Sequence, residues 1–321
     1  MNYRQAIVEA NNAYVPAETG LKVDVFGRYV RFLDAKPRTV DAYKRALQNF
    51  FNFLQANGDA TKPTREDVLN YRAHLEAQGL KSTTRQSYII AIRQFFKWTA
   101  SEGIYPNIAD KVKGAGINPF HKRDYLTEDQ LGAVLSSLKN DTETEKRDYA
   151  MILLMVTSGL RTIEVSRARI EDMGVMGGFP VLFVQGKGRD DRADYVKLSE
   201  VALDAINDYL ETRGETNKRA PLFTSTSNNS KGKTLTTRSI SGIVKNSLVN
   251  AGFNTSRLTA HSLRHTAVTL SLLNGMPIEE ARDLARHSNI ATTMVYAHHI
   301  KRESNRCVDV LNGIVKRVSH S

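Results

Sequence analysis

The sequence predicts a two-domain protein built mainly from α-helices, with a small antiparallel β-sheet in its second half. Three observations lead to this fold class. The 321 residues exceed what one hydrophobic core usually organises. Apolar side chains in the first hundred residues recur at helical spacing, in segments separated by proline and glycine. Two short runs of β-branched and aromatic residues, between positions 180 and 198, flank a polar turn.

The first domain is predicted to be a small all-α bundle. Its four expected helices cover about residues 23–33, 39–56, 64–79 and 83–101. Thr39 and Thr64 are suitable N-cap residues, because a threonine hydroxyl can accept a hydrogen bond from a free backbone N–H of the first turn. Lys36-Pro37 and Asn57-Gly58 supply the breaks that end the first two helices.

A basic segment, residues 105–124, follows the bundle and is predicted to be an extended linker. It is punctuated by proline and glycine. Its basic residues are Lys111, Lys113, Lys122 and Arg123. Two interpretations stay open at this point: a solvated connector, which is the simpler, or a strap that lies along phosphates.

The second domain is predicted to be helical with a β-hairpin. Thr127 and Gln130 form a capping-box pattern that begins its first helix, and a strongly apolar helix ends at Ser158-Gly159. Strands are expected at 180–185 and 195–198, with Ser199 as the N-cap of the next helix. The turn region between the strands carries three cations, Lys187, Arg189 and Arg192. Residues 224–237 form a polar loop, and helices occupy most of the rest.

Composition narrows the function classes. The 45 Lys and Arg exceed the 34 Asp and Glu, and the net charge of +11 favours a polyanionic partner, most often nucleic acid. Charge alone does not decide this, since many basic proteins bind no nucleic acid. The single cysteine, Cys307, excludes an internal disulfide framework and a multi-cysteine zinc site. No apolar run approaches the roughly 18 residues of a membrane span and no signal peptide is visible, so we expect a cytosolic protein.

The candidate functional residues are cations, imidazoles and one tyrosine. P-loop, HExxH, GxSxG and dinucleotide-binding glycine motifs are missing, as are clustered carboxylates that would suggest a two-metal site. His261 and Arg264 lie three residues apart, on one face of an expected helix. Arg161, His287 and Tyr296 stand elsewhere in the second domain. Each of them taken alone is more often structural than catalytic.

The order and spacing of these residues resemble the tyrosine recombinase family, also called the phage integrase family. The resemblance covers about residues 21 to 312. It rests on GLRTIEV around Arg161, the Gly-Lys-Gly turn at Lys187, HSLRHT from His261 and HSNIATTMVYAH from His287. His-x-x-Arg, followed by a histidine 23 residues later and a tyrosine nine further on, is highly specific in that order.

The resemblance implies an architecture and domain boundaries. An N-terminal four-helix, SAM-like core-binding domain and a C-terminal catalytic domain would form a C-shaped clamp around DNA. The implied divisions are an N-terminal extension, the core-binding domain, the basic linker, the catalytic domain and a C-terminal tail, at 1–20, 21–104, 105–124, 125–298 and 299–321. The tail is expected to be an amphipathic helix that packs on its own domain or, as the resemblance favours, docks on a neighbouring protomer.

The resemblance also implies the chemistry. Tyr296 would attack a phosphodiester to give a 3′-phosphotyrosine, with His261 as the base, since a phenol with a pKa near 10 is a poor nucleophile. Arg161 and Arg264 would hold the charge of the pentavalent phosphate. Three further matches complete the implied site: Lys187 as the general acid, His287 as a hydrogen-bond donor to a phosphate oxygen, and Glu164 as a supporting carboxylate.

The implied function is site-specific recombination through a Holliday junction, for integration or excision of a mobile element or for resolution of replicons. It needs no metal or cofactor. Its expected partners are double-stranded DNA, on which the chain would form a homotetramer, and an accessory DNA-bending protein or a partner recombinase. No membrane partner is expected, and the protein would be associated with the nucleoid. The expected DNA-contact residues are Lys111, Lys113, Lys122, Arg123, Arg189 and Arg192.

Three alternatives and one departure accompany this interpretation. A type IB topoisomerase shares the tyrosine chemistry, and a catalytically silent DNA-binding regulator shares the charge; a metal-dependent nuclease is more distant. Where the family commonly has Leu-Gly-His, this chain has Ala285-Arg286-His287. Since His287 and Tyr296 keep their spacing, we expect this replacement to leave catalysis unaffected.

Overall fold

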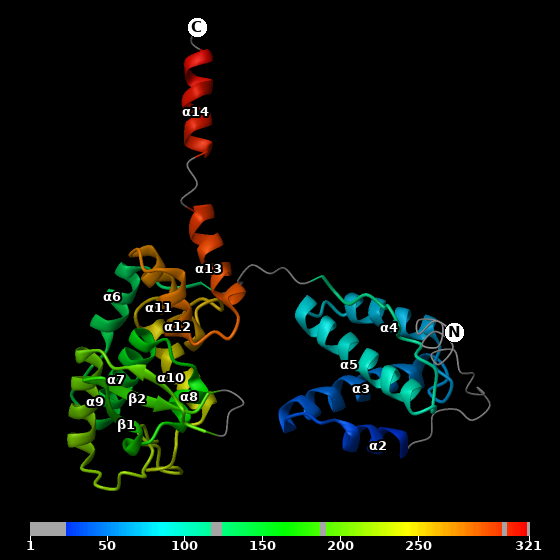
Figure 1. The fold of residues 1–321 in the computed structure, drawn as a ribbon, viewed down its shortest axis with the longest axis horizontal. Coiled ribbons are helices and arrows are strands. Elements are labelled where there is room, and N and C mark those ends of the chain that lie inside the picture. The colour runs from blue at the N-terminus through cyan, green and yellow to red at the C-terminus, as the bar shows by residue number, and fades with distance from the viewer. Residues whose placement is uncertain (1–23, 117–123, 187–190, 304–306, 320–321) are drawn as a thin grey trace. The chain divides into compact units, whose positions relative to one another are not determined.

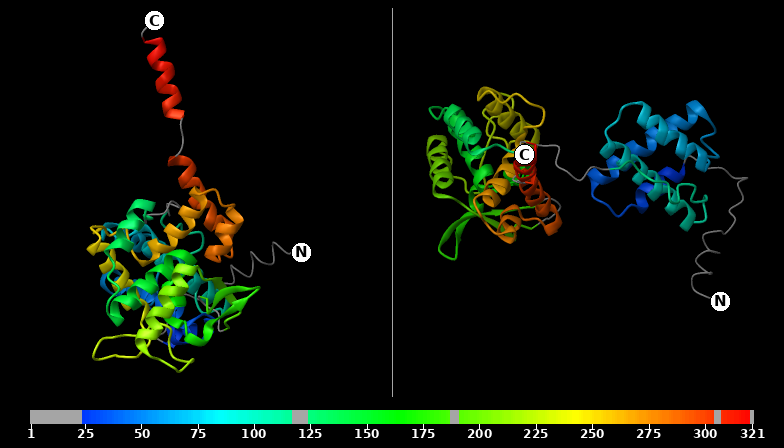
Figure 2. Two further views of the ribbon diagram at one scale, coloured as in Figure 1. Left: turned by 90° about the vertical axis from the view of Figure 1, so that its left-hand side faces the viewer. Right: turned by 90° about the horizontal axis from the view of Figure 1, so that it is seen from above.

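The computed structural model describes residues 24–116, 124–186, 191–303 and 307–319. The chain divides into two compact units, one ending at Asn118 and the other beginning at Pro119. Figures 1 and 2 show that both are mainly helical and that the second carries a small sheet. The mainly α fold with a small antiparallel sheet is therefore confirmed.

In the first unit, four helices surround an aromatic core. They are α2 (Asp24–Phe32), α3 (Pro37–Asn57), α4 (Arg65–Ala77) and α5 (Ser82–Ser101). The Phe50 ring on α3 meets Tyr71 of α4 and Phe96 of α5 edge to face, an arrangement that aromatic quadrupoles favour. Burial of these large rings contributes to the stability of the bundle.

Two local predictions in the first unit were wrong. Thr39 does not cap α3, which begins two residues earlier because Pro37 fits the first turn of a helix, where no N–H is needed. The first part of the predicted linker is folded, since Tyr105, Ala109 and Val112 are buried in the core of the bundle. Apolar side chains spaced along that segment decide its structure, in spite of its prolines and glycines. The remaining residues, 117–123, include Lys122 and Arg123 and lie outside the described residues.

The second unit contains several helices, one of which is strongly apolar and lies at its centre. The helices are α6 (Glu128–Ser137), α7 (Glu143–Ser158), α8 (Thr162–Arg167), α9 (Glu200–Arg213), α10 (Thr237–Asn250), α11 (Ala260–Leu273), α12 (Ile278–Ala285), α13 (Ile290–Glu303) and α14 (Cys307–Val318), with the 3-10 helix η2 (Ile170–Asp172). The central helix is α7, whose segment from Ala150 to Val156 is buried throughout. It contacts α9, α10 and α11, so these later helices are anchored to it.

The sheet has the antiparallel order β1-β2-β3, formed by β1 (Met173–Met176), β2 (Phe179–Val184) and β3 (Asp194–Lys197). The predicted hairpin is β2–β3, with Leu182 opposite Val196. The sequence prediction missed β1, a short strand in which the weak strand former Gly174 interrupts the pattern. Gly177 and Gly178 join β1 to β2 with positive φ angles of 58° and 83°, which a tight hairpin turn requires.

The predicted helix-capping residues of the second unit were confirmed. Thr127 and Gln130 form the expected capping box of α6, and the Ser199 hydroxyl accepts a hydrogen bond from the backbone N–H of Ala202 at the start of α9. Gly159 ends α7 in the left-handed region, at φ 58°. This turn sends the chain directly into Arg161. Within the described residues, the helices are all too short or too polar to cross a lipid bilayer.

Candidate active site

The site begins where α7 ends. Arg161 occupies the N-cap position of α8, and the Glu164 carboxylate accepts a hydrogen bond from the Arg161 backbone N–H at 2.8 Å. The other oxygen of Glu164 accepts from Arg161 Nη1 at 2.9 Å. Because Glu164 is buried while the Arg161 side chain keeps 30% of its surface exposed, the guanidinium is held in a defined place and still reaches solvent.

Arg264 of α11 is the second guanidinium. It is buried, with 1% of its surface exposed, and donates from Nη1 to the carbonyl of Gly159 at 2.6 Å and from Nη2 to the carbonyl of Ala285. These bonds join α11 to the turn after α7 and to the end of α12. The Nε of Arg264 is buried without a hydrogen-bond partner among the described residues. A buried donor of this kind costs free energy until a ligand supplies an acceptor.

Two imidazole rings flank the candidate nucleophile, and a third lies behind one of them. The Tyr296 ring on α13 lies 5.1 Å from the ring of His265 and is stacked at 6.3 Å on the ring of His287. His265 in turn lies 4.6 Å from His261, edge to face. His287 is oriented by Thr293, whose buried hydroxyl forms a 2.9 Å hydrogen bond with His287 Nδ1.

Burial and charge set the ionisation states of the site. Burial raises the pKa of Tyr296 to about 12, although the positive charges of Arg264 and Arg161 act in the opposite direction. Burial, with the repulsion of Arg161, lowers the pKa of Arg264 to about 9. Tyr296 is therefore a neutral phenol at pH 7 and Arg264 a crowded cation. Such a site favours an anion that restores charge balance and needs a base to activate the phenol.

Glu164 is held as a carboxylate between two arginines. Burial by itself would raise its pKa, but the charges of Arg286 and Arg161 and the bond from the Arg161 N–H outweigh this and leave the pKa below its usual value. Arg286 Nη2 lies 2.6 Å from Glu164. The Arg286 side chain is 9% exposed and belongs to the site.

The structure brings five of the sequence-predicted residues together: Arg161, Arg264, His261, His287 and Tyr296, with Glu164 beneath them. Lys187 and Arg189 lie outside the described residues. Arg192 is engaged in ion pairs with Asp172 and Glu171, so it is part of a local charge network. Lys111 and Lys113 belong to the first unit.

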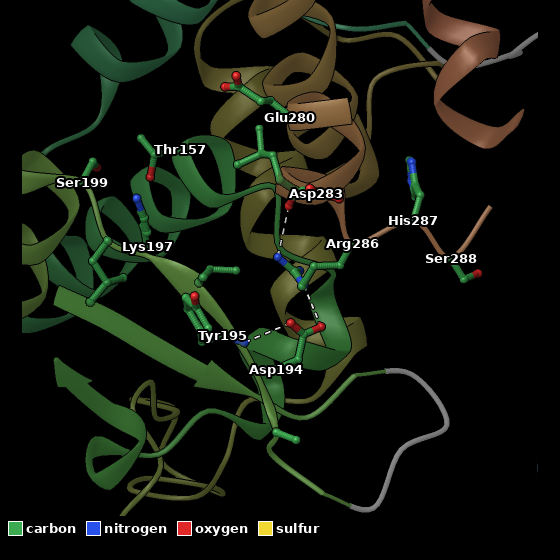
Figure 3. Close-up of a pocket in the computed structure, with 14 residues that line it drawn as sticks. Thr157, Asp194, Tyr195, Lys197, Ser199, Glu280, Asp283, Arg286, His287 and Ser288 are labelled. Carbon is green, nitrogen blue, oxygen red and sulfur yellow. Dashed lines mark hydrogen bonds and ion pairs between the residues drawn. The ribbon is translucent and has the colours of Figure 1, made fainter. Parts of the chain in front are cut away.

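Arg286, Thr293 and His265 also belong to the site, although they were not predicted from the sequence. His265 and Thr293 stand inside the quoted motifs, and their spacing from His261 and Tyr296 could have indicated them. Arg286 gave no local signal, because its partner Glu164 is 122 residues away. A pocket beside the site is lined by Arg286 and His287 together with residues of β3 (Figure 3). In that view Arg286 points toward Asp194, whereas His287 points away from it.

The whole chain was compared with protein-family models and curated proteins. The phage integrase family matches residues 124–303, and the phage integrase N-terminal SAM-like domain matches residues 27–103. Tyrosine recombinase XerC of Pelobacter propionicus is 32% identical over 270 residues, covering 82% of this chain and 85% of that protein. Tyrosine recombinase XerD of Rhizobium meliloti is 28% identical over 295 residues, covering 88% and 92%.

Solved structures share the fold. The XerH site-specific recombinase, bound to its palindromic difH substrate after cleavage, matches with a TM-score of 0.71 at 20% identity, over 85% of this chain and 80% of that one. A λ integrase dimer bound to a core site matches with a TM-score of 0.64 at 14% identity, over 83% and 95%. The motifs and the family matches agree along nearly the whole sequence. This chain therefore belongs to the phage integrase family and is a tyrosine-type site-specific recombinase.

Proposed function

We propose that the chain cuts and rejoins double-stranded DNA at specific sites, with Tyr296 as the nucleophile. One observation supports this proposal. The Tyr296 phenol is buried near the charges of Arg264 and Arg161, and its ring contacts those of His265 and His287. Attack of Tyr296 Oη on the phosphorus gives a 3′-phosphotyrosine and releases a 5′-hydroxyl. The reverse attack by a 5′-hydroxyl from a partner strand restores the phosphodiester and forms a Holliday junction.

Proton transfer is assigned to His261 and Lys187. Since the pKa of Tyr296 is raised, the phenol proton must be removed during attack, and His261 is the proposed base. Lys187, proposed to protonate the departing 5′-oxygen, lies in the sequence between β2 and β3, outside the described residues. His287 is proposed to donate to a non-bridging phosphate oxygen, with its ring fixed by Thr293.

Charge stabilisation is assigned to the two arginines. Arg161 offers an exposed guanidinium edge, and Arg264 offers a buried Nε donor that lacks an acceptor in the described structure. Both are rigidly held, so little reorganisation is needed as negative charge grows on the phosphate. Glu164 keeps Arg161 in place. One phosphodiester is exchanged for a phosphotyrosine and later restored, so the reaction needs no energy-rich cofactor.

DNA and further copies of this chain are the proposed partners. The related XerH and λ integrase structures contain their DNA sites, and the +11 charge of this chain suits the same polyanion. Lys111, Lys113, Lys122, Arg123 and Arg189 are the proposed contacts. The apolar side chains of α14 are exposed: Val308, Val310, Leu311, Ile314, Val315 and Val318. Docking of this helix on a neighbouring protomer would bury them and build a homotetramer on DNA.

The biological setting follows from the same proposal. Recombination would take place at the nucleoid in the cytoplasm, for a mobile element or for replicon resolution, with a partner recombinase or a DNA-bending protein as needed. The proposed domain divisions remain 21–104 for DNA core binding and 125–298 for catalysis. The basic segment 105–124 is proposed to cross the DNA backbone, although its first part is folded onto the helical bundle.

Covalent cleavage without added metal tests the proposed function. Nicked suicide substrates carrying candidate sites from the flanking genome are incubated with the protein in EDTA and no ATP, then resolved on denaturing SDS gels. Because arginines hold the phosphate charge, we expect a slow-migrating protein–DNA band at the same rate with or without EDTA. A specific gel shift without such a band would favour the silent regulator. Relaxation of supercoiled plasmid without strand exchange would favour the topoisomerase alternative.

Thr293→Val should reduce cleavage about fivefold to tenfold, as expected when one neutral hydrogen bond that orients a catalytic group is lost. Valine keeps the shape of threonine but removes the hydroxyl that binds His287 Nδ1. The rate of adduct formation at saturating DNA measures the effect. Thr292→Val, at an exposed neighbouring position of α13, is the matched control and should cleave normally. Equal rates for both variants would show that Thr293 does not orient His287.

A further inference from the structure

Arg286 adopts a backbone conformation that arginine rarely takes. Its φ and ψ are both 50°, in the left-handed region, where it caps the C-terminus of α12. A side chain with a Cβ is disfavoured there, and glycine is the usual residue at such a helix end. A non-glycine residue that persists in this conformation is compensated by contacts elsewhere.

The compensating contacts join three segments of the catalytic unit. Arg286 Nη2 forms an ion pair with Glu164 Oε2 at 2.6 Å, and Nη1 donates to the carbonyl of Leu284 at 3.1 Å. Nε lies 3.7 Å from the Asp194 carboxylate at the start of β3. Figure 3 marks this ion pair with a dashed line. The end of α12 is thereby tied to α8 and to the sheet.

Glu164 divides its two oxygens between the arginines. Oε1 accepts from the Arg161 side chain, while Oε2 accepts from the Arg161 N–H and from Arg286. Glu164 is 1% exposed, so solvent does not reach its carboxylate while both arginines are in place. Without Arg286, the carboxylate would be free to turn more fully toward Arg161 and draw that guanidinium away from the phosphate position.

We propose that Arg286 is a positioning residue for DNA cleavage: through Glu164 it holds Arg161 in the phosphate pocket, and its backbone turn sets the direction of the adjacent His287. This inference rests on the proposed function. Arg286 itself touches Glu164 and Asp194 and need not contact the reacting atoms. In this chain an arginine stands at a position where glycine would already allow the left-handed backbone conformation.

Two substitutions separate the guanidinium from the backbone strain. Arg286→Gly and Arg286→Ala both remove the side chain, but only glycine accepts the left-handed conformation without strain. We expect Arg286→Gly to melt at a higher temperature than Arg286→Ala. Both should form the covalent adduct about tenfold to 100-fold more slowly at saturating DNA, with unchanged DNA affinity, as for a small misplacement of a catalytic group. Arg282→Ala, which removes a 37% exposed side chain of α12 that pairs with Asp283, is the charge-matched control and should cleave normally.

Chemical rescue supplies a readout that a simple loss of stability would not give. Millimolar guanidinium added to Arg286→Gly should restore part of the cleavage rate by occupying the vacated site next to Glu164. Urea at the same concentration should have no effect. Parental cleavage rates in Arg286→Gly, or loss of rate that tracks melting temperature across the glycine and alanine variants without rescue, would overturn the proposal.

A double-mutant cycle measured by thermal unfolding tests the contact between Arg286 and Glu164 without DNA. If Arg286 acts through Glu164, the fall in melting temperature for Arg286→Gly combined with Glu164→Gln should be smaller than the sum of the two single falls. Additive falls would overturn the link. Because this cycle needs no cleavage, it gives a result even if the parent chain forms no adduct, and that separate outcome would refute only the proposed function.

Discussion

Tyr296→Phe should form no covalent adduct with DNA while binding its site with the affinity of the parent chain. The substitution removes only the hydroxyl, and the ring can keep its contacts with His265 and His287. Loss of an enzyme's nucleophile commonly costs at least about 10⁴-fold in rate. We therefore expect the covalent band to fall below detection on the suicide substrate, with an unchanged gel shift.

The control for Tyr296→Phe is another phenol near the same site. Tyr195 on β3 lines the neighbouring pocket and is exposed, so Tyr195→Phe should form the adduct at the parental rate. Peptide mapping of the adduct should place the modified tyrosine in α13. An adduct in Tyr296→Phe, or one mapped to a different tyrosine, would contradict the assignment of the nucleophile.

Arg161→Ala should lose cleavage by about 10²-fold or more, as when a preorganised donor to a developing negative charge is removed. The protein should remain folded, because the Arg161 side chain is partly exposed and Glu164 keeps its ion pair with Arg286. The measurement is the single-turnover rate of adduct formation at saturating DNA. Arg161→Lys should recover little of the loss, since an ammonium cannot bind a phosphate through two parallel donors.

The comparison for Arg161→Ala is Arg169→Ala. Arg169 is also paired with a glutamate, Glu171, but on an exposed surface, so its removal tests the loss of one charge alone. Arg264→Ala is a less informative choice, since it would leave the carbonyls of Gly159 and Ala285 without their donor and unfold part of the site. Near-normal cleavage by Arg161→Ala would remove Arg161 from the proposed mechanism.

Helix boundaries were predictable where one local contact decides them. Local contacts form the capping boxes at Thr127 and Thr142 and the left-handed turn at Gly159, since each joins atoms within about one helical turn of each other. The sequence alone therefore carries enough information to predict them. The same holds for the four-helix bundle, whose apolar spacing is helical. The boundary of α3 was missed by two residues because Pro37 and Thr39 are competing local signals.

Long-range burial was not predictable in the same way. Tyr105 and Val112 follow a helix in a segment rich in turn residues, and only the packed bundle shows that they complete its core. Arg192 has the sequence features of a DNA-contact residue, yet the structure pairs it with Asp172, 20 residues earlier. In both cases the partner is distant in sequence, so composition and spacing describe the residue but not its surroundings.

The sequence by itself determined the fold class, the family and the candidates Arg161, His261, Arg264, His287 and Tyr296, because motif order and helical periodicity are written along the chain. Only the tertiary structure decided which charges are buried. Arg264 meets Gly159 across 105 residues and Arg286 meets Glu164 across 122. A solvated arginine costs little free energy. Once folding has excluded water from around it, its guanidinium must be paired with hydrogen-bond acceptors or a carboxylate.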